Sequence, residues 1–174
     1  MSVIIREVIS KKDLKKWIEF PNSLYKNNEY YVPFLASDEE ETFSPTKNPA
    51  YDFCETKLFL AYKDNKPVGR IAGLINHAYN KKWGKNAIRF TRFDFIDDHE
   101  VSRALFDKVV AWGKENGLTE IMGPIGFTDM DHEACWLMAL KSLTFPSPFT
   151  TIPIILTTWT VWDSKRISIG SNTV

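Results

Sequence analysis

The amino-acid composition of this chain changes between Glu133 and Ala134. Of its 22 basic and 22 acidic residues, all but four lie in residues 1–133, and Glu does not recur in the 41 residues that follow. Those 41 residues also hold three of the six Trp residues. A globular domain normally mixes charged and apolar residues along its whole length. The change therefore restricts the interpretation of fold and function to the first 133 residues.

The genetic code offers an explanation for this change. Met and Trp each have one codon, so in a shifted frame Met138 followed by Ala139 must read Gly, and Trp159 followed by Thr160 must read Asp. With the free bases chosen permissively, the shifted frame reads MLVDGF from residue 134 and IYNYPYYPDHMDRLGF from residue 149. We therefore expect a one-base deletion just before the Ala134 codon and an out-of-frame tail over 134–174. The alternative is a genuine C-terminal tail of unusual composition.

Length and charge narrow the class of protein. At 174 residues the chain fits one domain with a sizeable core, and its net charge of zero gives it no overall attraction to nucleic acid or to an anionic membrane. No apolar run is long enough for a spanning helix, and the N-terminus MSVIIREV lacks the features of a signal peptide. Two Cys residues make no disulfide framework. These observations predict a cytoplasmic protein with neither a nucleic-acid nor a membrane partner.

Hydrophobic periodicity predicts an alternation of strands and helices. The expected strands cover residues 3–9, 57–64, 67–78, 87–96 and 119–127. The expected helices cover residues 11–20, 35–42 and 97–117. Pro21 is expected to interrupt the first helix, and Asp97 with Glu100 is expected to form the capping box of the last. The acidic run 38–41 is interpreted as a solvated helix start. The order of elements predicts an α/β fold with a mixed sheet.

The same order of elements resembles the GNAT (N-acetyltransferase) superfamily. The strings that carry the resemblance are LYKNNEYYVPFLASDEEETFSPTKNPAY (24–51), LFLAYKDNKPVGRIAGLINHAYN (58–80), FDFIDDHEVSRALFDKVVAWGKENGL (93–118) and GPIGFTDMD (123–131). They are similar to a bacterial group of uncharacterised GNAT-like proteins, in which the chain continues much as the shifted frame reads. The resemblance implies an incomplete GNAT-like domain over residues 1–133, a mixed sheet flanked by helices that lacks its C-terminal elements.

The resemblance also implies a site for acetyl-CoA at the fourth strand of the sheet. The backbone around Phe93, Phe95 and Ile96 would hold the pantetheine arm, and the start of the next helix would hold the pyrophosphate. The family's Gln/Arg-x-x-Gly-x-Gly/Ala loop is replaced by IDDHEVS (96–102), which has no Gly and carries three carboxylates. Two like charges ~4 Å apart repel by about 1 to 4 kcal/mol, depending on the dielectric. Arg103 or the basic loop 80–86 would have to compensate.

Residues 126–133 (GFTDMDHE) follow a strand and form a second candidate site. Asp129 and Asp131 are the candidate catalytic carboxylates, with a polar turn as the simpler interpretation. The spacing is too generic to indicate a metal site, and none is predicted. Arg89, Arg92 and Lys85 are candidates for binding an anion.

The leading prediction is a GNAT-like N-acyltransferase that transfers an acyl group from acetyl-CoA to a small-molecule amine acceptor. On the frameshift interpretation this particular chain is truncated and inactive. The alternative from another class is a non-catalytic ligand-binding or interaction module that kept the fold and lost the cofactor loop. A fragment without a settled fold is the third possibility. The sequence names neither the acceptor nor the oligomeric state.

Overall fold

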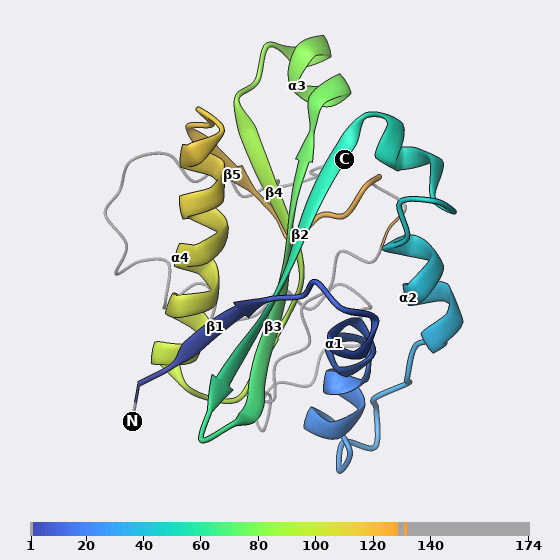
Figure 1. The fold of residues 1–174 in the computed structure, drawn as a ribbon, viewed down its shortest axis with the longest axis vertical. Coiled ribbons are helices and arrows are strands. Elements are labelled where there is room, and N and C mark those ends of the chain that lie inside the picture. Colours follow the sequence, from blue (N-terminus) through green and yellow to red (C-terminus); the bar gives the residue numbers. More distant parts are fainter. Residues whose placement is uncertain (1, 129–130, 132–174) are drawn as a thin grey trace.

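The computed structural model describes residues 2–128 and residue 131 (Figure 1). The tail, 134–174, and Asp129 lie outside the described residues. The strands are β1 (Ile4–Glu7), β2 (Cys54–Lys63), β3 (Lys66–Asn76), β4 (Ala87–Phe95) and β5 (Glu120–Met122). The helices are α1 (Lys11–Leu24), α2 (Ala36–Thr42), α3 (His77–Trp83) and α4 (His99–Glu115), with a 3-10 turn η1 (Pro49–Asp52). Within this described part, no helix is long and apolar enough to cross a membrane.

The strands form one mixed sheet in the order β1-β2-β3-β4-β5. Neighbouring strands are antiparallel from β1 to β4, whereas β5 runs parallel to β4. Helix α4 covers one face of the sheet, and α1 with α2 lies on the other (Figure 1). The predicted α/β class and mixed sheet are therefore confirmed. β4 is buried along its whole length because both faces of the sheet are covered.

The glycines of β3 allow α4 to approach the sheet closely. A Cβ atom on Gly69 would lie 2.8 Å from Cδ1 of Leu105, and one on Gly73 would lie 3.1 Å from the ring of Trp112. Large side chains on α4 therefore pack directly against the strand backbone. The core on this side also contains Phe90, Phe93 and Phe95 of β4.

Helix α1 continues through Pro21 to Leu24, so the predicted interruption at Pro21 was wrong. In a regular helix the N–H of residue 21 would donate to the carbonyl of Trp17, but proline has no N–H. The guanidinium of Arg70 on β3 supplies the missing donor, with Nη1 3.1 Å from the Trp17 oxygen. A cation on a neighbouring strand thus lets the helix tolerate an internal proline.

Helix α4 begins at His99, two residues later than predicted. Its N-cap is Asp98, whose Oδ1 accepts a hydrogen bond from the N–H of Glu100 at 2.9 Å. The predicted capping box of Asp97 and Glu100 was therefore wrong. The Glu100 carboxylate instead lies 3.0 Å from Nζ of Lys63, at the end of β2.

Candidate functional site

The second half of β4 has an open edge. β5 pairs with β4 only from Ala87 to Arg89, and then the N–H of Ile125 donates to the carbonyl of Phe90 at 2.9 Å. The predicted strand 119–127 ends early, at Met122, because Pro124 cannot donate to a ladder. Among the described residues, no strand pairs with residues 91–95 on the side away from β3. An extended ligand could therefore add to the sheet there.

The backbone direction of this open segment follows from one hydrogen bond. The N–H of Ile96 donates to the carbonyl of Val68 on β3 at 2.9 Å, so this amide is already bonded within the sheet. In an antiparallel pair, successive residues turn their backbone groups to opposite sides. The N–H and C=O groups of Phe93 and Phe95 therefore point toward the open edge. Of the three residues expected to hold a pantetheine arm, Phe93 and Phe95 thus turn their backbone groups to an edge that no strand of the described residues covers, whereas the N–H of Ile96 is bonded to β3.

A bulge at Arg92 sorts the side chains of β4 between the two faces. Arg92 has a φ of 52°, which is unusual for a residue other than glycine, and the register with β3 shifts between Arg70 and Ala72. The extra residue keeps Phe90 and Phe93 together under α4, with their rings 5.9 Å apart and perpendicular. The polar side chains of β4 therefore face α1 and α2.

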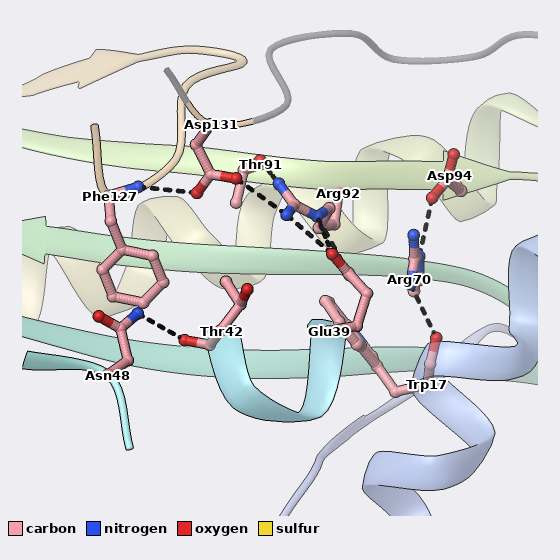
Figure 2. A network of polar contacts seen from close by, with 10 residues as sticks. All are labelled: Trp17, Glu39, Thr42, Asn48, Arg70, Thr91, Arg92, Asp94, Phe127 and Asp131. Carbon is pink, nitrogen blue, oxygen red and sulfur yellow. Dashed lines mark hydrogen bonds and ion pairs between the residues drawn. The ribbon is translucent and has the colours of Figure 1, made fainter. Parts of the chain in front are cut away.

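Arg92 is the centre of a buried polar network on that second face (Figure 2). Its guanidinium contacts both carboxylate oxygens of Glu39, with Nη2 2.9 Å from Oε1, and Nη2 also lies 3.0 Å from Oδ1 of Asp131. Nη1 donates to the hydroxyl of Thr91 at 3.1 Å. Burial disfavours the charged guanidinium, but the hydrogen bonds and charges of Glu39 and Asp131 outweigh it and raise the pKa of Arg92.

The burial of Glu39 corrects the interpretation of the acidic run 38–41. Its side chain is only 5% exposed, whereas Asp38 and Glu40 are exposed. Sequence reasoning missed this residue because its partner Arg92 lies 53 positions away. The four successive acids of this run gave no local signal that distinguishes Glu39 from its neighbours.

A second buried network joins α1 to β3 and β4. Nε of Arg70 lies 2.7 Å from Oδ2 of Asp94, and the hydroxyl of Tyr25 donates to Oδ1 of the same carboxylate at 2.9 Å. The guanidinium of Arg70 also stacks on the ring of Trp17, 4.5 Å from its centroid. Figure 2 shows Arg70 between Asp94 and Trp17. These contacts hold α1 against the part of β4 whose outer edge is open.

Asp131 lies at the first network, while Asp129 is outside the described residues. One oxygen of Asp131 contacts Arg92, and the other accepts from the N–H of Phe127 at 3.2 Å. Both carboxylate oxygens are therefore occupied by partners within the protein, and this geometry favours the polar-turn interpretation over a general base. Arg89 likewise donates to a carbonyl, that of Gly126 at 3.1 Å, rather than presenting itself to an anion.

Lys63 offsets the acidic start of α4. Its Nζ lies 2.6 Å from Oδ2 of Asp98 and 3.0 Å from Oε2 of Glu100. The hydrogen bond from Lys63 is the main cause that lowers the pKa of each carboxylate. Two of the three carboxylates expected to repel a pyrophosphate therefore share one ammonium group. Sequence reasoning missed Lys63 because it lies on the hairpin rather than in the loop before the helix.

Arg103, the cation expected to compensate, lies on the exposed surface of α4. Its side chain is 64% exposed, and its Nε lies 3.8 Å from Oδ2 of Asp107, one turn along the helix. The ion pairs of Lys63 with Asp98 and Glu100 thus supply positive charge at the acidic helix start.

The fold described above is that of GNAT acetyltransferases. A tandem GNAT protein from the clavulanic acid biosynthesis pathway superposes with a TM-score of 0.53 and 12% identity, over 69% of this chain and 35% of that one. An aminoglycoside acetyltransferase from an uncultured soil metagenomic sample superposes with a TM-score of 0.53 and 12% identity, over 99% of this chain and 96% of that one. At such identities the likeness shows the fold alone, and it confirms the resemblance at that level.

The sequence itself is similar to two bacterial proteins. It is 36% identical to Protein YghO of Escherichia coli (strain K12) over 121 residues, which is 70% of this chain and 31% of YghO. It is 27% identical to the bacterial ceramide synthase of Caulobacter vibrioides over 117 residues, which is 67% of this chain and 30% of that enzyme. The match thus spans about a third of the length of each relative. No protein-family model matches the sequence.

Proposed function

We propose that residues 1–133 are an incomplete N-acyltransferase domain, which in its complete form transfers an acyl group from acetyl-CoA to an amine. The observation that carries the proposal is the open edge of β4 at Phe93 and Phe95, in a GNAT fold. Pantetheine is an extended chain with two amide groups, so it can pair with this edge as an added strand does. The start of α4 follows β4 directly and would face the pyrophosphate.

The reaction needs an amine nucleophile and a proton acceptor. The amine attacks the thioester carbonyl, its proton passes to a base, and the thiolate of CoA leaves as the amide forms. The sequence similarity to a bacterial ceramide synthase supports an amine acceptor, because a ceramide is the amide of a long-chain amino alcohol. Asp129 stays the candidate base on this chain, since Asp131 is held by Arg92.

We further propose that residues 134–174 are translated out of frame and that this chain does not turn over acetyl-CoA. The support is the change in composition after Glu133 and the ordinary composition of the shifted reading. Sequencing the source DNA across codons 130–140 tests the frame, and an intact frame that encodes the printed tail would refute it. Robust acetyl-CoA turnover by the 174-residue chain would refute its inactivity.

Two observations favour the non-catalytic module. The loop before α4 has no glycine, and among the contacts of the described residues Lys63 pairs with Asp98 and Glu100 but not with Asp97. Calorimetric titration of acetyl-CoA separates the two functions. It should be made on the protein in the reading frame that the DNA sequence establishes. Micromolar binding supports the acyltransferase, and no binding supports the module.

A further inference from the structure

Helix α3 contributes nothing to the hydrophobic core. None of its seven residues is buried, and it projects beyond the ends of β3 and β4 at one end of the molecule (Figure 1). Polar contacts hold it in place: Oδ1 of Asn76 accepts from the N–H of Tyr79 at 2.7 Å, and Nδ2 of Asn80 donates to the carbonyl of Ala87 at 2.9 Å. The ring of Tyr79 also lies 4.4 Å from the guanidinium of the buried Arg89, so the inner side of the helix is anchored while Lys81, Lys82 and Trp83 remain exposed.

The charge around α3 is strongly positive. Residues 65–93 contain no Asp or Glu, although the whole chain is neutral. The three arginines of this stretch, Arg70, Arg89 and Arg92, are buried in the sheet. Three lysines on or just after α3 are exposed: Lys81, Lys82 and Lys85. Two acidic side chains lie at the edges of this surface: Glu120, 3.8 Å from Nζ of Lys85, and Glu55, 2.8 Å from Nε2 of His77.

An exposed aromatic side chain lies among these lysines. Trp83 is 61% exposed, and Nζ of Lys82 lies over its ring, 5.1 Å from the centroid. Tryptophan prefers the boundary between lipid headgroups and acyl chains, and lysines near it are attracted to anionic headgroups. We propose that residues 77–86, the α3 surface, dock on an anionic lipid membrane.

The neutral net charge, from which no membrane partner was expected, does not oppose this docking. At ~0.1 M salt, charges further than about 10 Å from the lipid are screened, so the local charge decides. Nucleic acid is a poorer fit, because proteins that bind it typically make roughly 6 to 10 phosphate contacts and favour arginine. The α3 surface offers three lysines, and the arginines of this stretch are buried.

Sedimentation with lipid vesicles tests the proposal on the 174-residue chain. We expect it to bind phosphatidylcholine vesicles that contain one third phosphatidylglycerol at ~0.1 M salt, and to be released at ~1 M salt. We expect no binding to pure phosphatidylcholine. Equal binding to both vesicles would overturn the proposal, because it would reflect apolar adhesion without charge.

Lysine variants test whether the α3 surface is the part of the chain that binds the vesicles. The triple change Lys81→Gln, Lys82→Gln, Lys85→Gln is expected to lower the partition coefficient about 100-fold, or about fivefold for each lysine. The matched control changes three other exposed lysines to Gln, Lys11, Lys12 and Lys26, and is expected to bind as the parent does.

Trp83→Ala is expected to weaken binding several-fold without changing its salt dependence, whereas Tyr30→Ala, at another exposed aromatic residue, leaves it unchanged. Circular dichroism checks that each variant is folded. Parent-like binding by a folded triple variant would overturn the proposal. So would binding of single-stranded RNA as tight as that of vesicles and lost in the same variant.

Discussion

Arg92 and Glu39 form a buried ion pair, with Nη2 2.9 Å from Oε1, that fastens helix α2 to the bulge of β4. Both side chains are at most 5% exposed, so neither charge is solvated by bulk water. Removal of one partner from such a pair leaves an uncompensated charge in the interior. The pair therefore holds α2 against the face of the sheet that lies opposite α4.

Glu39→Gln is expected to lower the free energy of unfolding by about 3 kcal/mol, at the low end for a broken buried pair because Asp131 still contacts Arg92. Urea denaturation measures the loss. The control is Glu40→Gln, at the next, exposed position of the same helix, which should change stability by less than about 0.5 kcal/mol. If Glu39→Gln and Glu40→Gln changed the free energy of unfolding equally, the buried pair would contribute no more to stability than an exposed carboxylate does.

The hydrogen bond from Arg70 to the Trp17 carbonyl predicts a coupling with Pro21. Arg70→Met is expected to destabilise the fold, because it leaves that carbonyl and the Asp94 carboxylate without this partner. In a Pro21→Ala background, the new N–H can donate to the carbonyl of Trp17. The cost of Arg70→Met should then fall by about 1 kcal/mol.

A double-mutant cycle read by urea denaturation measures this coupling. Lys66→Met, at an exposed cation of the same strand, should show no coupling with Pro21→Ala. If Arg70→Met lowered the free energy of unfolding equally in both backgrounds, Arg70 would not be compensating for the N–H that Pro21 lacks.

Sequence patterns predicted the elements whose signals are local. Strands β2, β3 and β4 and helix α4 carry long apolar periodicities, and the phenylalanines of β4 lie together in the core under α4. The error at Pro21 has a distant cause, because Arg70 on β3 donates to the Trp17 carbonyl that the proline leaves without its helical donor. At the start of α4 the cap is Asp98 and not the predicted Asp97, because Asp98 accepts from the N–H of Glu100.

The candidate site could be predicted only in part for the same reason. The open edge at Phe93 and Phe95 lies in the strand that the GNAT resemblance indicated. The buried partnership of Arg92 with Glu39 joins residues 53 positions apart, and nothing in the acidic run around Glu39 marks it as the buried member. The prediction for Asp129 stays untested, since that residue lies outside the described part.

Lys63 predicts a pH dependence of stability. It lowers the pKa of Asp98 below the ordinary value of 3.8. The stability that the Lys63–Asp98 pair contributes is therefore present above that value and is lost as the pH falls through the lower pKa of the folded state. Lys63→Gln should therefore reduce stability at neutral pH, and the difference from the parent should vanish in strong acid. Urea denaturation at a series of pH values measures this. Lys108→Gln, at an exposed lysine of α4, is the control, and a difference that grows toward acid pH would refute the assignment.

Because α4 packs closely on β3, adding a single methyl group at Gly69 is expected to destabilise the fold. Gly69→Ala would place its Cβ 2.8 Å from Cδ1 of Leu105 and 2.9 Å from Cβ of Phe95, which forces the helix or the strand to move. Overpacking of this kind costs about 1 to 3 kcal/mol. The melting temperature should fall accordingly. An unchanged melting temperature would show that the helix lies further from the sheet than described.

The proposed function requires that an acyl-CoA adds to the open edge of β4. Amide hydrogen exchange, with and without acetyl-CoA, tests this most directly on the protein in the frame that its DNA establishes. We expect acetyl-CoA to slow exchange at Phe93 and Phe95, whose N–H groups face the open edge, and to leave Ile96, already bonded to Val68, unchanged. Unchanged exchange along β4 at saturating acetyl-CoA, or protection confined to other elements, would contradict it.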